Sequence, residues 1–243
     1  YIRSNILKFP DPQKPRPVTV NTWEALYFDH RLDRLKQLAD AAAEVGSERF
    51  VLDDGWFKGR NDDTTSLGDW IPDPEKYPDG LQPIVDYVID EKNMEFGLWV
   101  EPEMVNPQSD LFQNHPDWVL QFAPYPQITG RNQMVLDLTN QAVMDYLYGQ
   151  LSDLLAEYRI SYLKWDMNRD LVLPGDRAGN AAVYRQTCGL YQLMDRLRAA
   201  FPKVEIESCA SGGGRIDFEI LKRTHRFWTS DSNDAVERTR IQT

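Results

Sequence analysis

Two aspartates at the ends of strand-like segments are the residues of this sequence best suited to catalysis. Asp166 ends the run ISYLKWD, in which Tyr162, Lys164 and Asp166 share one face of a strand because successive side chains alternate. If that face points inward, the ammonium group of Lys164 lies beside the carboxylate, lowers its pKa and keeps it ionised, as a nucleophile requires. A buried ion pair that only supports the structure would have the same spacing, and this alternative stays open.

A second acid lies at the end of the run RFWTSD. Asp231 ends that strand-like segment, whereas Asp234 follows it, where a helix is expected to begin and acidic residues are common. Ser230 and Asp231 would also suit the N-cap of that helix. Hydrolysis of a glycosidic bond with retention needs an ionised and a protonated carboxyl group about 5–5.5 Å apart. We therefore predict that Asp166 and Asp231 form a catalytic pair.

A vicinal pair of acids occurs in the run LDDGW. Strict alternation would point either Asp53 or Asp54 away from the site, but Gly55 permits an irregular strand end from which both reach it. Two neighbouring carboxylates are good acceptors for the hydroxyl groups of a sugar. A solvated turn is the alternative structure for such a run.

A metal site is a further interpretation of the acidic residues. Asp53, Glu101, Asp166 and Glu207 could bind Mg²⁺ as carboxylates do in enolase-type barrels, although Lys164 among them argues against it. Cys209 has no histidine near it in the sequence to activate it, so we expect a packing residue and not a nucleophile. Four tryptophans offer flat faces to a sugar ring, although aromatic side chains are also common in cores: Trp56, Trp99, Trp165 and Trp228.

These residues need a scaffold, and the hydrophobic pattern alternates strand-like with helix-like segments. We predict strands over residues 16–24, 48–56, 94–103, 160–166, 204–210 and 226–231. We predict helices over residues 33–46, 81–93, 141–158, 180–202 and 214–225. Residues 104–139 have no clear period. A short strand is one interpretation of residues 133–139, but we favour a loop that leads into the next helix. Strands that alternate with helices predict a parallel sheet covered by helices.

The choice of fold lies between a doubly wound sheet and a (β/α)₈ barrel. No glycine-rich phosphate fingerprint follows the first strand, and the run SGGG at 211–214 is only a weak phosphate signal. Acids and tryptophans gather instead at the C-terminal ends of strands, where barrel enzymes have their active sites. They are Trp23, Glu24, Asp53, Asp54, Trp56, Trp99, Glu101, Trp165, Asp166, Trp228 and Asp231. We therefore predict an incomplete (β/α)₈ barrel with about six βα units.

The composition narrows the class of partner. The net charge is −11 and the pI is about 4.8, so the surface would repel nucleic acid and anionic membranes. No apolar run approaches the roughly 20 residues of a membrane helix, and the polar, proline-rich start is unlike a signal peptide. Two cysteines are too few for a disulfide framework and favour a reducing, cytoplasmic compartment. The three histidines are not spaced as metal ligands, which argues against zinc hydrolysis.

Several motifs then occur in one order: NTWEALYFD, LDDGWF, LGDW, GLWVEPEMVNPQSDL, RNQMVLDL, LKWDMNRD, ESCASGGGR and FWTSDSNDAVER. In these motifs, spread over nearly the whole chain, the sequence resembles glycoside hydrolase family 36, the bacterial-type α-galactosidases. The resemblance implies a (β/α)₈ catalytic barrel between a large β-sandwich and a small β domain. Residues 1–17 would be the lead-in from the β-sandwich, and residues 18–243 a partial barrel without its last two units. Such a chain would be a piece of a longer protein.

The resemblance also implies roles for individual residues. Asp166 would be the nucleophile and Asp231 the acid/base. Asp53 and Asp54 would bind the 4- and 6-hydroxyls of galactose, with Trp99 as a wall. The same subsite would be lined by Arg131, Lys164, Cys209 and Gly212. No metal or other cofactor is implied, the partner would be a small-molecule α-galactoside, and the whole protein is expected to be a homo-oligomer.

These features predict a retaining α-galactosidase that hydrolyses terminal α-galactosyl residues of oligosaccharides of the melibiose and raffinose type. A raffinose-synthase-like transferase would use the same two acids and pass galactose to a sugar instead of water. A non-catalytic carbohydrate-binding barrel is the other alternative. Because two barrel strands would be absent, the first and sixth strands would have exposed edges, and we expect the isolated chain to be inactive or poorly soluble.

Overall fold

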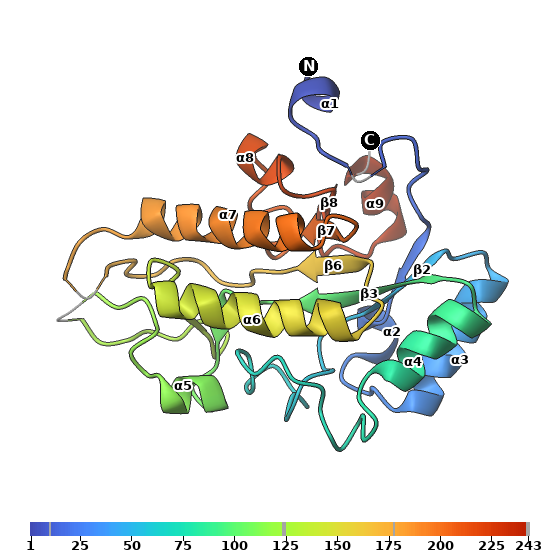
Figure 1. Cartoon of the computed structure of the whole chain (residues 1–243), viewed down its shortest axis with the longest axis horizontal. Helices are drawn as coiled ribbons and strands as arrows, with labels where there is room; N and C mark the ends of the chain where they lie inside the picture. Colours follow the sequence, from blue (N-terminus) through green and yellow to red (C-terminus); the bar gives the residue numbers. More distant parts are fainter. Residues whose placement is uncertain (10, 123–124, 177, 242–243) are drawn as a thin grey trace.

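The fold is built on one parallel sheet. The computed structural model describes residues 1–9, 11–122, 125–176 and 178–241 (Figure 1). Its main sheet has six parallel strands in the order β1-β2-β3-β6-β7-β8. The strands are β1 (Thr19–Asn21), β2 (Arg49–Leu52), β3 (Glu95–Val100), β6 (Tyr162–Trp165), β7 (Glu205–Ser208) and β8 (Arg226–Phe227). The six predicted strands are therefore confirmed, although each is shorter than its hydrophobic run.

The sheet curls so that its two edges approach each other. Arg226 on β8 donates hydrogen bonds to Oγ1 of Thr19 on β1, at 2.8 Å, and to the carbonyl of Pro17, at 2.7 Å. In a flat sheet of this size the edges would lie about 24 Å apart, five spacings of about 4.8 Å, which is far beyond the reach of one arginine. The sheet is therefore curled like part of a (β/α)₈ barrel, as the sequence predicts.

Helices cover the outer face of this sheet. Figure 1 shows α6 and α7 side by side along it. The outer helices are α3 (Leu32–Glu44), α4 (Gln82–Asp86) with the π-helical turn η1 (Tyr87–Glu91), α6 (Gln141–Glu157), α7 (Val183–Ala200) and α8 (Phe218–Leu221). The last helix, α9 (Ala235–Ile241), has no buried residues. In α3 the buried residues Leu35, Ala39 and Ala42 follow the helical period, and α6 begins where the Asn140 side chain accepts from Ala142 N–H. The apolar core lies between these helices and the sheet.

Polar side chains occupy the inner face of the sheet. The guanidinium of Arg49 lies 4.1 Å from the centre of the Tyr162 ring and binds the carboxylates of Glu95 and Glu205. The Tyr162 hydroxyl donates to Glu207 at 2.5 Å. Buried polar groups are stable only when they are paired, so these contacts keep the inner layer of the sheet ordered beneath the site.

The structure corrects two interpretations of the sequence. Trp23 and Glu24 do not end the first strand but lie in the short helix α2 (Trp23–Leu26), because the Asn21 side chain accepts from Trp23 N–H at 2.8 Å and turns the chain. Residues 133–139, interpreted as a loop, contain β5 (Met134–Val135), which pairs antiparallel with β4 (Met104–Val105). This pairing satisfies backbone groups that would otherwise be buried without partners.

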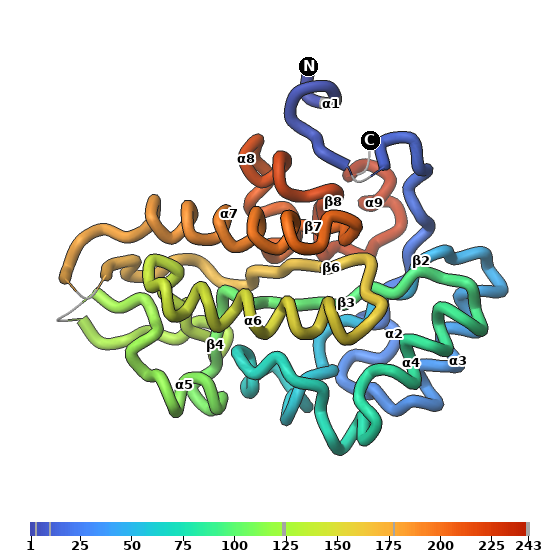
Figure 2. The backbone as a smooth tube through the Cα atoms, in the orientation of Figure 1, coloured from blue at the N-terminus to red at the C-terminus, as the bar shows by residue number. Residues whose placement is uncertain are grey.

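Two further short helices complete the fold, α1 (Ile2–Asn5) and α5 (Asp110–Asn114), the latter in a region predicted to be irregular. The segment before β1 packs on the second half of the chain (Figure 2). Arg198 of α7 donates to the carbonyl of Lys8, and the rings of Phe9 and His225 lie 5.8 Å apart. No helix among the described residues is long and apolar enough to cross a membrane.

Candidate active site

The C-terminal ends of the main strands surround one pocket of about 1360 Å³. Predicted site residues that line it are Asp53, Asp54, Trp99, Arg131, Lys164, Asp166 and Asp231. Arg131 is exposed, lines the pocket and has left-handed backbone with a φ of +50°. The pocket exceeds the roughly 300–1,000 Å³ typical of ligand sites because it continues into the gap between β8 and β1, where Arg226 and Thr19 line it.

Asp166 is held by donors from three parts of the chain. Its Oδ2 accepts from the indole N–H of Trp99 at 3.0 Å and from the amide of Asn168 at 2.8 Å, and Oδ1 accepts from Met167 N–H at 2.9 Å. The Cys209 thiol also donates to this carboxylate. Burial raises the pKa of Asp166, but the positive charge of Lys164 and these hydrogen bonds outweigh it and leave the pKa below its usual value. The carboxylate is therefore ionised and fixed.

Lys164 lowers the pKa of Asp166, as its spacing predicts, but its ion pair is with another strand. Its Nζ lies 2.8 Å from Oδ2 of Asp53, which also accepts from the Asn21 amide at 2.5 Å. Burial lowers the pKa of Lys164, and the carboxylates of Asp53 and Asp166 more than reverse this, so the pKa is raised. The ammonium group thus attracts both carboxylates, and the buried ion pair that the sequence left as an alternative for Lys164 and Asp166 is formed with Asp53 instead.

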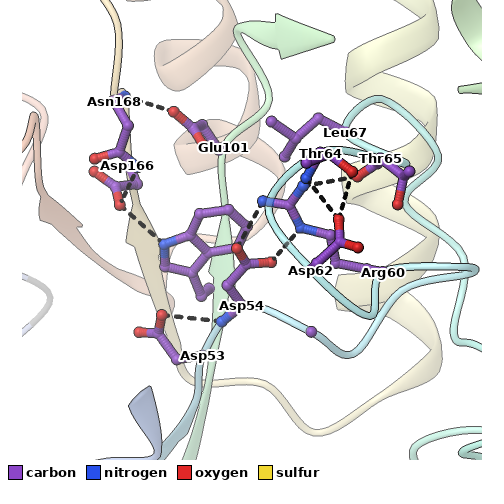
Figure 3. A network of polar contacts seen from close by, with 12 residues as sticks. Asp53, Asp54, Arg60, Asp62, Thr64, Thr65, Leu67, Glu101, Asp166 and Asn168 are labelled. Atoms are coloured by element: carbon purple, nitrogen blue, oxygen red, sulfur yellow. Dashed lines mark hydrogen bonds and ion pairs between the residues drawn. The ribbon is translucent and has the colours of Figure 1, made fainter. Parts of the chain in front are cut away.

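Asp54 forms a buried ion pair with Arg60 (Figure 3). The Arg60 guanidinium binds it with two arms, at 2.9 Å and 2.8 Å, and donates to the Thr65 carbonyl with the remaining nitrogen. Burial raises the pKa of Asp54 more than Arg60 lowers it. Both vicinal acids reach the pocket because Gly55, at φ +118°, turns the strand end, so the solvated-turn alternative is wrong for this run. Sequence analysis missed Arg60, which no local pattern pairs with Asp54.

Asp231 lies at the exposed rim of the same pocket. Its Oδ1 accepts from the indole N–H of Trp228 at 2.8 Å. Gly212, at φ +85°, passes so close to this segment that a Cβ there would lie 3.0 Å from Cα of Ser230 and 3.4 Å from N of Asp231. Asp234 instead accepts from the N–H groups of residues 236 and 237, which confirms the helix-start interpretation.

The run 209–214 therefore connects the two candidate acids, since Cys209 donates to Asp166 and Gly212 packs on the backbone of Asp231. Neither residue lines the pocket itself; both lie directly behind its wall. Burial raises the pKa of Cys209 and so does the neighbouring charge of Asp166, which keeps the thiol neutral and able to donate. Cys209 therefore does more than fill space, the role expected from the sequence, because it also donates a hydrogen bond to Asp166.

The predicted tryptophans divide into two groups. Trp99 and Trp228 line the pocket, whereas Trp56 and Trp165 are fully buried beneath it. Trp99 is also nearly buried, with its ring parallel to that of Phe57 at 6.3 Å between ring centres, so it is a rigid wall whose N–H points at Asp166.

The four acids considered as Mg²⁺ ligands bind different protein groups. Asp53 pairs with Lys164, Glu207 accepts from a tyrosine hydroxyl, and Glu101 accepts from the Asn168 backbone N–H. Among the residues that the structure describes, no three His, Cys, Asp or Glu side chains are placed to hold a metal ion. The donor set instead fits hydrogen bonding to a polar, uncharged ligand.

Comparisons with known proteins agree with this geometry. The family model for melibiase matches residues 1–243. An alpha-galactosidase of Escherichia coli is 57% identical over 242 residues, which are 100% of this chain and 34% of that protein. Alpha-galactosidase AgaA of Geobacillus stearothermophilus is 46% identical over 235 residues, which are 94% of this chain and 32% of that protein. The chain thus spans about a third of the length of the curated relatives it matches.

Solved structures give the same result. The crystal structure of that AgaA, a glycoside hydrolase family 36 α-galactosidase, matches with a TM-score of 0.94 at 44% identity, and the match covers 99% of this chain and 34% of that one. Variants of AgaA have been solved with 1-deoxygalactonojirimycin, with stachyose and with raffinose, and these match at TM-scores of 0.93 to 0.94 and 43% identity, over 99% of this chain and 34% of each of theirs. The resemblance seen in the sequence motifs is confirmed.

Proposed function

Because this chain belongs to the melibiase family, we propose that it carries the galactoside-binding site and both catalytic acids of a retaining α-galactosidase. The observation that supports this best is the ionised Asp166, held by four donors in a pocket whose rim carries a second carboxyl group on Asp231. The related AgaA structures hold 1-deoxygalactonojirimycin, stachyose and raffinose, which indicates the ligand class.

The proposed reaction has two displacements. Asp166 attacks the anomeric carbon while Asp231 gives its proton to the departing glycosidic oxygen, which leaves a galactosyl ester on Asp166. Asp231 then takes a proton from water, which attacks the same carbon and releases Asp166. The anomeric configuration is inverted twice, so the product keeps the α configuration.

Selectivity for galactose is proposed to come from the two vicinal acids. Asp53 and Asp54 face the pocket with their oxygens oriented by Lys164 and Arg60. An axial 4-hydroxyl and a 6-hydroxyl would donate to them, whereas glucose would leave buried acceptors unpaired. Arg131 and the Trp99 wall would complete the subsite.

The test uses the intact protein with melibiose and raffinose. Proton NMR of the first product formed should show α-galactose, whereas β-galactose would reject double displacement. Replacement of Asp231 by asparagine should slow raffinose far more than an aryl galactoside with an acidic leaving group, because only raffinose needs the proton. With sucrose added as acceptor, a galactosylated product in place of free galactose would favour the transferase. If Asp166→Asn leaves both hydrolysis and transfer unchanged, a non-catalytic protein would be favoured.

The same proposal extends to the rest of the protein. We propose that the gap between β8 and β1 receives the last two units of a (β/α)₈ barrel, that residues 1–17 are the lead-in from a preceding domain and that residues 18–243 are the partial barrel. A cytoplasmic location and a homo-oligomeric whole protein belong to the same proposal, and cell fractionation and analytical ultracentrifugation test them.

A further inference from the structure

Glu101 is a buried carboxyl group that the proposed reaction does not use. It follows β3, is 1% exposed and lies in the wall of the pocket. Figure 3 shows it directed at Asn168, on the side of the site where Asp166 lies. Its Oε1 accepts from the Asn168 backbone N–H at 2.5 Å, and the side-chain amide of Asn168 donates to Asp166. One residue therefore links Glu101 to the candidate nucleophile.

Glu101 is buried as Asp53 and Asp54 are, but unlike these two acids it has no ion pair among the described residues. Asp53 pairs with Lys164 and Asp54 with Arg60, but no Lys or Arg of the described chain forms an ion pair with Glu101. A fully buried, unpaired carboxylate is costly, so such a group takes up a proton instead.

The charges around Glu101 act in the same direction. From the loop after β6 it faces Asp166, and from the loop after β2 it faces Asp54, which is neutralised by Arg60. Arg169 donates to the backbone carbonyl of Gln133, and Glu103 on the same segment as Glu101 is paired with Arg215. Burial first, and the negative charge of Asp166 second, raise the pKa of Glu101 to about 8.

The side chain of the neighbouring Gln133 can accept a hydrogen bond from a protonated Glu101. Its Nε2 donates to Oε2 of Glu101 at 3.3 Å, a long contact, while its Oε1 is buried and has no partner in the part of the chain that the structure describes. If the amide turns by half a rotation, Oε1 replaces Nε2 and accepts from a protonated Glu101. Only the neutral acid can donate on this side while it still accepts from Asn168 on the other.

We propose that Glu101 is a positioning residue that acts as a neutral carboxylic acid: it fixes Asn168, which orients Asp166, without placing a second negative charge beside the nucleophile. The role of Asp166 rests on the proposed function. When Glu101 ionises, it can no longer donate to Gln133, the amide turns back to donate to it, and a second negative charge repels Asp166. The contacts that orient Asp166 through Asn168 are then disturbed, so activity should fall at alkaline pH.

Protonation of Glu101 can be measured without any activity. In the intact protein labelled with ¹³C at glutamate side-chain carboxyls, the resonance that disappears in Glu101→Gln should titrate near pH 8. In Asp166→Asn its midpoint should move down, because one charge that opposes ionisation is gone. A midpoint in the usual glutamate range near 4.3, or one that Asp166→Asn does not move, would overturn the proposal.

Activity gives the second readout. Glu101→Gln imitates the neutral acid, so its kcat/KM at pH 6.5 should stay within about threefold of the parent while the alkaline limb moves up by about one pH unit or more. Glu101→Ala cannot hold Asn168 and should lose about 30-fold or more. Asp69→Asn, which changes a buried carboxyl outside the pocket, is the matched control and should leave the profile in place.

Equal losses in Glu101→Gln and Glu101→Ala, or an alkaline limb that does not move, would contradict the positioning role. If the intact protein hydrolyses no α-galactoside, the proposed function fails, but the titration still decides the state of Glu101.

Discussion

Replacement of Lys164 by methionine should destabilise the protein and raise the pKa of Asp166 at the same time. The Lys164 and Asp53 side chains are 11% and 3% exposed, and Nζ lies 2.8 Å from Oδ2. Methionine keeps most of the aliphatic stem but removes the charge. Asp53 would then keep only the Asn21 amide and the Asp54 backbone N–H as donors within the described residues.

The size of the effect follows from burial. Removal of one partner of a buried ion pair costs about 3–5 kcal/mol because the other charge stays buried and unpaired. Asp53 lines the pocket, and water that enters there solvates it in part, so we expect a loss of about 3 kcal/mol in the free energy of unfolding. The double variant Lys164→Met/Asp53→Asn removes both charges and should recover more than half of that loss.

Urea unfolding of the intact protein, followed by tryptophan fluorescence, measures these free energies. The matched control is Lys58→Met, because Lys58 and Asp110 form a pair of similar length, 2.7 Å, with side chains 52% and 67% exposed. This variant should unfold like the parent. A Lys164→Met protein as stable as the parent, or a double variant no more stable than the single one, would show that this ion pair does not stabilise the fold.

The pH dependence of activity tests the effect of Lys164 on the pKa of Asp166 independently of stability. The folded-state pKa of Asp166 is lowered, so its stabilising effect is present above the unfolded pKa and is lost as the pH falls through the folded value. Without Lys164 the pKa rises. The acid limb of kcat/KM, which reports the nucleophile of the free enzyme, should therefore move to higher pH in Lys164→Met.

Four further substitutions test the packing and the site. Gly189→Ala would place a Cβ 2.4 Å from a backbone oxygen and should reduce the free energy of unfolding by about 1–3 kcal/mol. Gly149→Ala, whose Cβ would have no atom within 4 Å, should increase it by about 0.5–1 kcal/mol. Urea unfolding measures both. Gly212→Ala should lower kcat/KM by about tenfold or more by displacing the segment of Asp231; unchanged kinetics would show that this contact does not matter. Arg60→Lys keeps the charge but not the two-armed contact, so KM for melibiose should rise about tenfold with a smaller change in kcat. A tenfold fall in kcat with an unchanged KM would contradict the role of Asp54, the partner of Arg60, in substrate binding.

The fold could be predicted largely because strands and helices differ in hydrophobic period. The buried strands β2 and β3 contain the apolar runs FVL and FGLWV, and β6 is apolar except for Lys164. Helices α3 and α6 have helical spacing and recognisable ends. The missed elements have no period to detect: β4 and β5 have two residues each, and α2 begins only because Asn21 turns the chain.

The site could be predicted in part for a similar reason. Alternation placed Lys164 and Asp166 on one face, and the motifs supplied Asp53, Asp54 and Asp231. The partners of these acids were not visible, since Lys164 pairs across strands 111 residues apart in sequence, and Arg60 meets Asp54 only through a loop. Glu101 was noticed as an acid at a strand end, but its lack of a cation is a tertiary property.

In the described sheet β1 and β8 are edge strands, each paired with one neighbouring strand. The sequence predicts two exposed edge strands, and the structure shows that Arg226 joins them by hydrogen bonds across the gap. Whether the isolated chain is inactive or poorly soluble stays a prediction. Expression of residues 1–243 alone, with assay of the soluble fraction, tests it, and robust turnover by the purified chain would contradict it.

In the proposed reaction Asp166 forms the covalent bond to the sugar. The most direct measurement is mass spectrometry of proteolytic peptides after the intact protein is inactivated with a fluorinated galactosyl donor. The fluorosugar should be found on Asp166, and Asp166→Asn should take up none. A label on Asp53, Asp54 or Asp231, or no covalent adduct in an active protein, would contradict this account.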